Sequence, residues 1–223
     1  DSTMKILVTA GPTREPIDTV RFISNASSGR MGFALAAEAV ARGHEAVLLA
    51  GPVALETPAG VRRRDFVTVC DLQTALAEEF PSCDALAMSA AVGDFTVTRI
   101  ASQKLSRRAG PVEITLLPTP DLIAGVAQAK RADQVVCAFA VEDLPHAEAV
   151  AKARDEMARK YADLVVLNTP EAMAASASWA CILSPDGVLL EGADRCKTEL
   201  AAMIVDRLEA EYQRKCANQK EGS

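Results

Sequence analysis

Residues 9–32 decide the fold of this chain and read Thr-Ala-Gly-Pro-Thr-Arg-Glu-Pro-Ile-Asp-Thr-Val-Arg-Phe-Ile-Ser-Asn-Ala-Ser-Ser-Gly-Arg-Met-Gly. A short apolar run at residues 6–8 precedes them, and an alanine-rich amphipathic run at residues 31–42 follows. This pattern predicts a strand, a loop of about twenty residues and a helix, whereas such loops usually hold about two to six residues. Ligands bind at the carboxyl ends of strands in α/β sheets, so we expect this loop to form part of a binding site.

The chemistry of the loop indicates phosphate binding. Small and hydroxyl-bearing residues gather at the predicted start of the helix: Ser27, Ser28, Gly29 and Gly32. Unpaired N–H groups at a helix N-terminus attract oxyanions, and glycines let an anion approach the backbone closely. Positive charge and an amide are also available, from Arg14, Arg21, Arg30 and Asn25. The alternative is an ordinary capped helix after a long surface loop.

The bulk properties of the chain restrict its class. It has 223 residues, 49% of them hydrophobic, and its net charge of −6 argues against binding to nucleic acid or to a membrane. We expect a cytoplasmic protein without a signal peptide. One domain is predicted over residues 4–215, with residues 1–3 left from an expression tag and residues 216–223 as a disordered tail. The six cysteines form no Cys-x-x-Cys pair and the two histidines lack nearby ligand partners, so we expect reduced thiols and no protein metal site.

Apolar runs alternate with helical patterns, which predicts an α/β fold with a doubly wound, Rossmann-like, mostly parallel sheet. We expect strands at residues 6–8, 45–50, 64–69, 85–91, 135–140 and 163–167. We expect helices at residues 31–42, from 71, from 120, at 145–160 and at 194–215, with Asp71 and Thr119 as caps. Residues 92–110 form a predicted basic flap loop, followed by an antiparallel strand at 112–117. A hairpin with a Pro-Asp-Gly turn at 181–190 adds a small antiparallel extension.

Four more candidates follow the ends of predicted strands, which share one edge of a parallel sheet. Asp94 can hold a hydroxyl or a metal-bound water, or can only shape a turn. Lys104 on the flap can reach a triphosphate, or is an ordinary solvated lysine. Phe139 can stack on a base or sugar or belong to the core, and Asn168 can contact a ligand or only form a turn.

Five stretches together resemble one known family. They are residues 10–18 (Ala-Gly-Pro-Thr-Arg-Glu-Pro-Ile-Asp), 21–32 (Arg-Phe-Ile-Ser-Asn-Ala-Ser-Ser-Gly-Arg-Met-Gly), 90–94 (Ala-Ala-Val-Gly-Asp), 104–105 (Lys-Leu) and 119–123 (Thr-Pro-Asp-Leu-Ile). Through them the chain resembles phosphopantothenoylcysteine synthetase, the ligase that follows pantothenate kinase in coenzyme A biosynthesis. The resemblance extends over residues 5–211.

The resemblance implies a reaction in two steps. A nucleoside triphosphate first activates the carboxylate of 4′-phosphopantothenate as an acyl-nucleotidylate and releases pyrophosphate. The amine of cysteine then displaces the nucleoside monophosphate and forms an amide. The resemblance favours CTP over ATP, and it implies Mg²⁺ bridging the triphosphate and a homodimer.

The resemblance also implies roles for single residues. Asn25 would steady the oxyanion of the acyl intermediate, and Lys104 would neutralise phosphate charge during activation, so both would be catalytic. The nucleotide pocket would be lined by Gly11, Ser27, Gly29, Gly32, Ser89, Asp94, Pro120, Asp121, Leu122, Ile123, Phe139, Lys160 and Asn168. Phosphopantothenate would be held by Asn25, Ala90, Ala91, Asp94 and Arg21 of a second subunit. Glu156 occupies the first position of the family's Lys-x-x-x-Lys pair, which removes one positive charge from the expected triphosphate contacts.

Two other classes share the predicted sheet. A nucleotide-cofactor oxidoreductase is disfavoured because the sequence lacks Gly-x-Gly-x-x-Gly after the first strand and lacks a Tyr-x-x-x-Lys pair. Gly-x-x-x-x-Gly-Lys-Ser/Thr and Gly-x-Ser-x-Gly are also missing. A noncatalytic nucleotide sensor is disfavoured because the chain retains Asn25, Asp94 and Lys104 together.

Overall fold

The computed structural model of the chain describes residues 3–170 and 177–221. Within these residues the main sheet has eight strands in the order β12-β11-β10-β9-β6-β1-β4-β5. The strands are β1 (Lys5–Ala10), β4 (Glu45–Ala50), β5 (Arg62–Asp65), β6 (Ala85–Met88), β9 (Val135–Val141), β10 (Leu164–Asn168), β11 (Ala177–Ser184) and β12 (Gly187–Cys196).

The sheet confirms the predicted fold class. The strands from β5 to β10 pair in parallel in the order β5-β4-β1-β6-β9-β10. Numbered along the chain this order is 3-2-1-4-5-6, the doubly wound arrangement of Rossmann-like proteins. Strands β11 and β12 extend the β10 edge in antiparallel pairing, as the hairpin pattern predicts. The reversal between β1 and β6 opens a crevice where ligands of such sheets bind.

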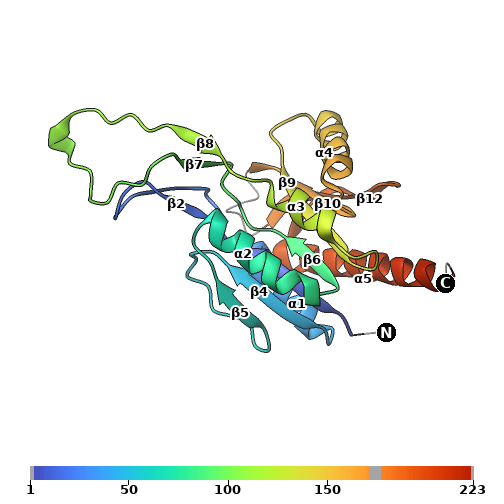
Figure 1. Cartoon of the computed structure of the whole chain (residues 1–223). Coiled ribbons are helices and arrows are strands. Elements are labelled where there is room, and N and C mark those ends of the chain that lie inside the picture. The colour runs from blue at the N-terminus through green and yellow to red at the C-terminus, as the bar shows by residue number, and fades with distance from the viewer. Residues whose placement is uncertain (1–2, 171–176, 222–223) are drawn as a thin grey trace.

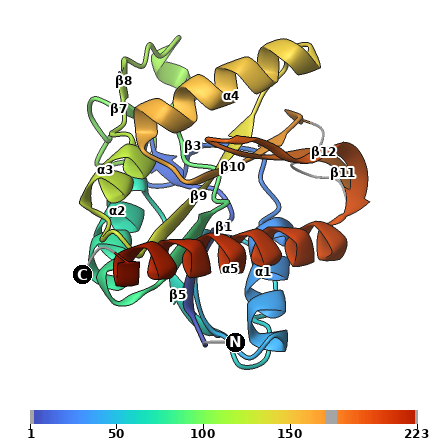
Figure 2. The ribbon, with the colours of Figure 1, turned by 90° about the vertical axis from the view of Figure 1, so that its right-hand side faces the viewer.

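Helices cover both faces of the sheet (Figures 1 and 2). Helices α1 (Arg30–Ala41) and α5 (Lys197–Glu221) pack on one face, and α2 (Val69–Glu79), α3 (Leu122–Ala129) and α4 (His146–Lys160) pack on the other. Alternate residues of β1 supply the two cores: Ile6 and Val8 face α1 and α5, whereas Leu7 faces α2. No helix in the described part of the chain is both long and apolar enough to cross a bilayer.

An extended arm projects from the sheet beside β1 and β6 (Figure 1). We define the arm as residues 14–24 and 95–118, which contain the β2–β3 hairpin (Arg14–Pro16 and Phe22–Ser24) and the paired strands β7 (Phe95–Val97) and β8 (Leu116–Pro118). The predicted antiparallel pairing is confirmed, but the bounds of the flap loop at 92–110 and of the strand at 112–117 are wrong in detail. The two strands lie where β7 pairs with β8, from Phe95 opposite Pro118 to Val97 opposite Leu116. Residues 112–115 come before the first paired residue of β8, so they are not part of the strand.

Two predicted helix caps are wrong by a few residues. Thr68, in an extended conformation, caps α2 through a capping box in which Asp71 is the third helical residue. Strand β5 ends at Asp65 instead of continuing to residue 69, because its pairing partner β4 ends opposite it at Ala50 and residues 68–69 cap and start α2. Asp121 caps α3, while the hydroxyl of Thr119 donates to the carbonyl of Gly93 at 2.6 Å.

Helix α5 is longer than predicted and continues through residues 216–221 of the expected tail. No glycine or proline interrupts this stretch, and Lys215 Nζ anchors it by contacts to the Gln134 carbonyl at 2.8 Å and to Asp163 Oδ1 at 2.7 Å. Residues 222–223 of that tail, and residues 1–2 of the predicted tag remnant, lie outside the described residues.

Candidate functional site

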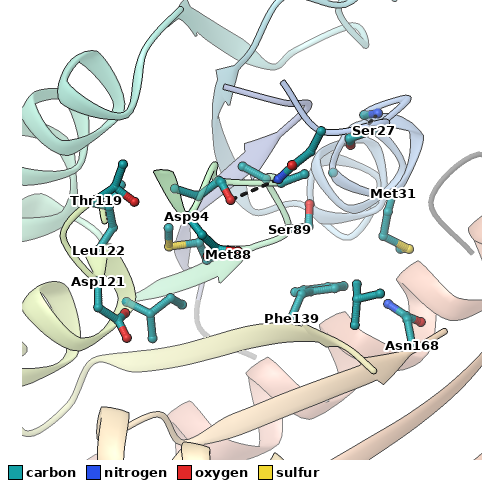
Figure 3. Close-up of a pocket in the computed structure, with 18 of the residues that line it drawn as sticks. Ser27, Met31, Met88, Ser89, Asp94, Thr119, Asp121, Leu122, Phe139 and Asn168 are labelled. Atoms are coloured by element: carbon teal, nitrogen blue, oxygen red, sulfur yellow. Dashed lines mark hydrogen bonds between the residues drawn. The ribbon is translucent and has the colours of Figure 1, made fainter. Parts of the chain in front are cut away.

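A cavity of about 800 Å³ lies at the carboxyl edge of the parallel strands (Figure 3). It is bounded by the loop from β1 to α1 and by the chain after β6, so it occupies the crevice between these two strands. Its wall consists of residues 25–32, 88–92, 94–95 and 118–123, together with Phe139, Val141, Glu156, Arg159, Lys160, Asn168 and Lys197.

The N-terminus of α1 opens into this cavity. Gly29 caps the helix in the left-handed region at φ 75°, no described side chain caps it, and the first turn contains no acidic residue. The hydroxyl of Ser27 accepts from the Gly29 N–H at 3.3 Å. The N–H groups of the first helical turn therefore keep their partial positive charge, which suits a phosphate.

Gly32 brings α1 against the sheet. A Cβ at this position would lie 2.4 Å from the Cβ of Ala10 and 2.8 Å from the carbonyl oxygen of Thr9. A side chain there would push the helix N-terminus away from β1 and out of the cavity wall.

Asn25 lies on the cavity wall beside this helix N-terminus. Its Nδ2 donates to the carbonyl oxygen of Val92 at 3.1 Å, a contact between the first loop and the chain after β6. A primary amide has two N–H donors. One of them fixes the orientation of the Asn25 side chain, and the other remains to donate to a ligand.

The chain after β6 forms the opposite wall with small residues. Ser89 donates from Oγ to the Thr9 carbonyl at 2.6 Å, and the Ala90 N–H donates to Thr9 Oγ1 at 3.1 Å. These contacts hold the backbone of residues 89–91 close to β1, where the methyl side chains of Ala90 and Ala91 leave room for a ligand. The exposed carboxylate of Asp94 completes this wall.

One end of the cavity offers an aromatic ring and an amide. Figure 3 shows Met31, Phe139 and Asn168 gathered at this end, with Asp121 and Leu122 at the other. Asn168 is only 8% exposed, and its Oδ1 has no hydrogen-bond partner among the residues that the structure describes. Buried polar atoms are nearly always paired, so an orphaned oxygen in a cavity wall indicates a place for a ligand.

Charged side chains at the C-terminal end of α4 line the same cavity. Lys160 Nζ lies 3.3 Å from Asp121 Oδ2 and 3.5 Å from Glu156 Oε2. The ammonium group of Lys160, which the sequence predicts to contact the nucleotide, thus already pairs with two carboxylates. Arg159 and Lys197 also line the cavity, and burial lowers the pKa of Lys197.

The structure places most predicted site residues in the cavity but leaves out three. Gly11, with φ +80°, does not line the cavity. Its carbonyl accepts from the Ala91 N–H at 2.9 Å, so it shapes the loop, and an added Cβ would lie 3.1 Å from Val53. Arg21 and Lys104 lie on the arm, and both are exposed. The remaining predicted residues line the cavity: Asn25, Ser27, Gly29, Gly32, Ser89, Ala90, Ala91, Asp94, Pro120, Asp121, Leu122, Ile123, Phe139, Lys160 and Asn168.

Sequence reasoning missed some cavity residues. Arg159 and Lys197 carry no local motif, and only the packing of α4 and α5 brings them to this wall. Arg14, a predicted source of positive charge, lies on the arm instead and stacks 4.4 Å above the Phe22 ring. Among the described residues no three His, Cys, Asp or Glu side chains gather as metal ligands.

The fold and cavity define a doubly wound α/β protein with a crevice at its switch point, into which the N-terminus of α1 opens. The family model described as DNA/pantothenate metabolism flavoprotein C-terminal domain matches residues 2–212. The chain therefore belongs to this family.

Relatives and solved structures agree with this assignment. Two curated proteins are 39% identical over 74% of the chain: the coenzyme A biosynthesis bifunctional protein CoaBC of Escherichia coli strain K12, and a protein of an unknown prokaryotic organism named cysteine/cysteine sulfinic acid decarboxylase. The chain spans 41% and 45% of their respective lengths, less than half of each. A crystal structure of the C-terminal domain of CoaBC has 29% identity and a TM-score of 0.78, over 95% of this chain and 96% of that one.

Proposed function

We propose that the chain is a phosphopantothenate–cysteine ligase that acts in coenzyme A biosynthesis through an acyl-nucleotidylate. The observation that carries the proposal is the arrangement of the cavity. The uncapped N-terminus of α1 and the side-chain amide of Asn25 open into the same space. A phosphate binder and an oxyanion donor side by side suit acyl transfer from a nucleotidylate. The likeness to the C-terminal domain of the coenzyme A biosynthesis bifunctional protein CoaBC supports the proposed role in coenzyme A biosynthesis.

In the proposed first step, an oxygen of the phosphopantothenate carboxylate attacks the α-phosphorus of CTP or ATP, and pyrophosphate leaves. The α1 N-terminus and the cationic end of α4 would hold the phosphates, while Phe139 and Asn168 would contact the nucleoside. Lys104 would offset the charge that develops on the phosphates. We expect CTP to be preferred over ATP.

In the proposed second step, the amine of cysteine attacks the acyl carbon, a proton is lost, and the nucleoside monophosphate leaves with the electron pair of its bond. Asn25 would donate its free N–H to the oxyanion that forms. Ala90, Ala91 and Asp94 would position the pantothenate portion. Mg²⁺ would neutralise the triphosphate, and phosphate oxygens would supply most of its ligands because the described residues gather no ligand set of their own.

A second copy of the chain is proposed to complete the site. The arm exposes Val20, Phe22, Phe95, Ile100, Val112, Ile114, Leu116 and Leu117, each at least 40% accessible. Exposed apolar patches of this kind mark interaction surfaces. A homodimer formed through the arm would bring Arg21 of one subunit to the phosphopantothenate in the cavity of its partner.

The test is pyrophosphate release from the purified protein with 4′-phosphopantothenate, cysteine and magnesium, with CTP compared with ATP. We expect release that depends on phosphopantothenate, and an amide product when cysteine is present. Tight nucleotide binding without release would favour the sensor, and binding of a nicotinamide cofactor would favour the oxidoreductase.

A further inference from the structure

Asp18 is a buried carboxylate in the turn between β2 and β3. Its side chain is 0% exposed. Its Oδ1 accepts from the N–H groups of Val20 and Arg21, both at 2.7 Å, and these two bonds close the turn. Its Oδ2 accepts from the Leu105 N–H at 3.0 Å and from Arg21 Nη1. Oδ1 thus accepts hydrogen bonds only from the turn, whereas Oδ2 accepts them from the flap backbone and from the Arg21 side chain.

Further bonds join the same two segments. Arg21 Nη1 also donates to the Leu105 carbonyl at 3.2 Å, and the Ala101 N–H donates to the Ile17 carbonyl at 2.9 Å. The Leu105 N–H, followed by the other donors, holds the pKa of Asp18 well below its usual range, so this carboxylate stays ionised. Lys104 adjoins Leu105, with Cα atoms about 3.8 Å apart across one peptide bond. The flap backbone that carries Lys104 is therefore bonded to Arg21.

We propose that Asp18 is a positioning residue that holds Arg21 and Lys104 as one unit, so that both cations act on the same cavity. This inference rests on the proposed ligase function. A carboxylate needed only for the turn would use Oδ1, whereas the Oδ2 bonds fix the flap and the guanidinium. We call the Oδ2 bonds of Asp18 to the Leu105 N–H and to Arg21 Nη1 the Asp18 clasp. Charge-assisted hydrogen bonds to ionised groups are about twice as strong as neutral ones, so the clasp links the β2–β3 turn firmly to the flap.

The first test is Asp18→Asn. The amide can keep its oxygen at the Oδ1 position for the turn, and its NH₂ then faces the donors of Leu105 and Arg21. We expect acyl-nucleotidylate formation to slow by about 10- to 100-fold, the cost of a misplaced charge, with little change in the KM for cysteine. The matched control is Glu15→Gln. This buried carboxylate at the base of the same hairpin accepts from the Val69 N–H and from the hydroxyl of Thr96 on β7. In the described structure it bonds neither Arg21 nor residues 104–105, the groups that Asp18 holds.

A second measurement separates positioning from a structural role. In a chain that already carries Arg21→Ala and Lys104→Ala, Asp18→Asn should cost no further activity, because it acts only through these two side chains. An equal loss in both backgrounds would overturn the proposal, and so would full activity of the single variant.

The closing experiment uses heterodimers, made by co-expressing two differently tagged variants and purifying on both tags. It begins only after the wild type releases pyrophosphate, so failure of the ligase proposal is recognised first. A heterodimer of one Arg21→Ala subunit and one Lys104→Ala subunit should be inactive. Each cavity then receives its two cations from a single arm, and each arm lacks one of them. Asn25→Asp paired with either arm variant should give about half of wild-type activity, since one of the two cavities in a twofold dimer is complete. Activity in the Arg21→Ala/Lys104→Ala heterodimer, or different results for the two Asn25→Asp pairs, would show that the cations serve different cavities and would overturn the inference.

Discussion

The side-chain amide of Asn25 bonds to the Val92 carbonyl, and this bond determines which N–H remains for a ligand. A carboxylate at this position can accept but cannot donate to an oxyanion. It would also face the Val92 carbonyl oxygen, so the side chain would lose its fixed orientation.

We therefore expect Asn25→Asp to slow amide formation by about 100-fold or more, the scale of losing one oxyanion donor. Nucleotide affinity should change little. Rapid-quench measurement of amide formation from the preformed acyl-nucleotidylate, with nucleotide titration alongside, checks both expectations. Wild-type amide formation would remove Asn25 from the mechanism.

Glu156 pairs with the cations of α4, so in the proposed ligase it would compete with the triphosphate for them. Its carboxylate lies 3.5 Å from Lys160 Nζ and 3.8 Å from Arg159. Glu156→Gln removes this competition and should lower the KM for the triphosphate by up to about fivefold, because partly exposed pairs are worth about 1 kcal/mol at most. Initial rates over a range of triphosphate concentrations measure the effect. Glu148→Gln, on the exposed first turn of the same helix, is the control. An equal fall in the KM for this variant would show that net charge, and not the pairing of Glu156, causes the effect.

At the scale of elements, the N-terminus of α1 lies where it does because Gly32 has no side chain. We expect Gly32→Ala to destabilise the fold by about 1 to 3 kcal/mol, the usual cost of overpacking, and to weaken nucleotide binding by moving the helix. Urea unfolding and nucleotide titration measure the two effects.

The matched control is Gly125→Ala in α3, where an added Cβ meets no atom of the described residues within 4 Å. Here the better helix propensity of alanine should stabilise the fold by up to about 1 kcal/mol. Equal stability changes for the two variants would show that packing against β1 does not determine the position of α1.

At the scale of the whole molecule, the arm is the segment that exposes a group of large apolar side chains. Ile114→Glu places a charge on this surface outside the paired strands, so it should prevent association while the sheet remains folded. We expect a monomer in sedimentation analysis, with a wild-type far-UV spectrum and little ligase activity. Val188→Glu, at an exposed apolar position on β12, should leave the association unchanged. An active Ile114→Glu monomer would contradict the shared site.

The sequence by itself determined the parallel sheet and most of the cavity wall. Buried strands such as β1 and β4 appear as continuous apolar runs, and loop residues that follow parallel strands must meet at one edge. The sequence pattern therefore predicts that the 25–32 segment belongs to the site, and this segment lines the cavity. Only the tertiary structure decided what depends on contacts between distant segments. Strand β8 is exposed and β7 buries only Val97, so neither strand has a buried periodicity. Arg159 and Lys197 reach the cavity through helix packing, and Gly11 lies outside the cavity wall. The Asp18 clasp joins residues 87 positions apart, and no local pattern encodes a bond from a carboxylate to a backbone N–H at that separation.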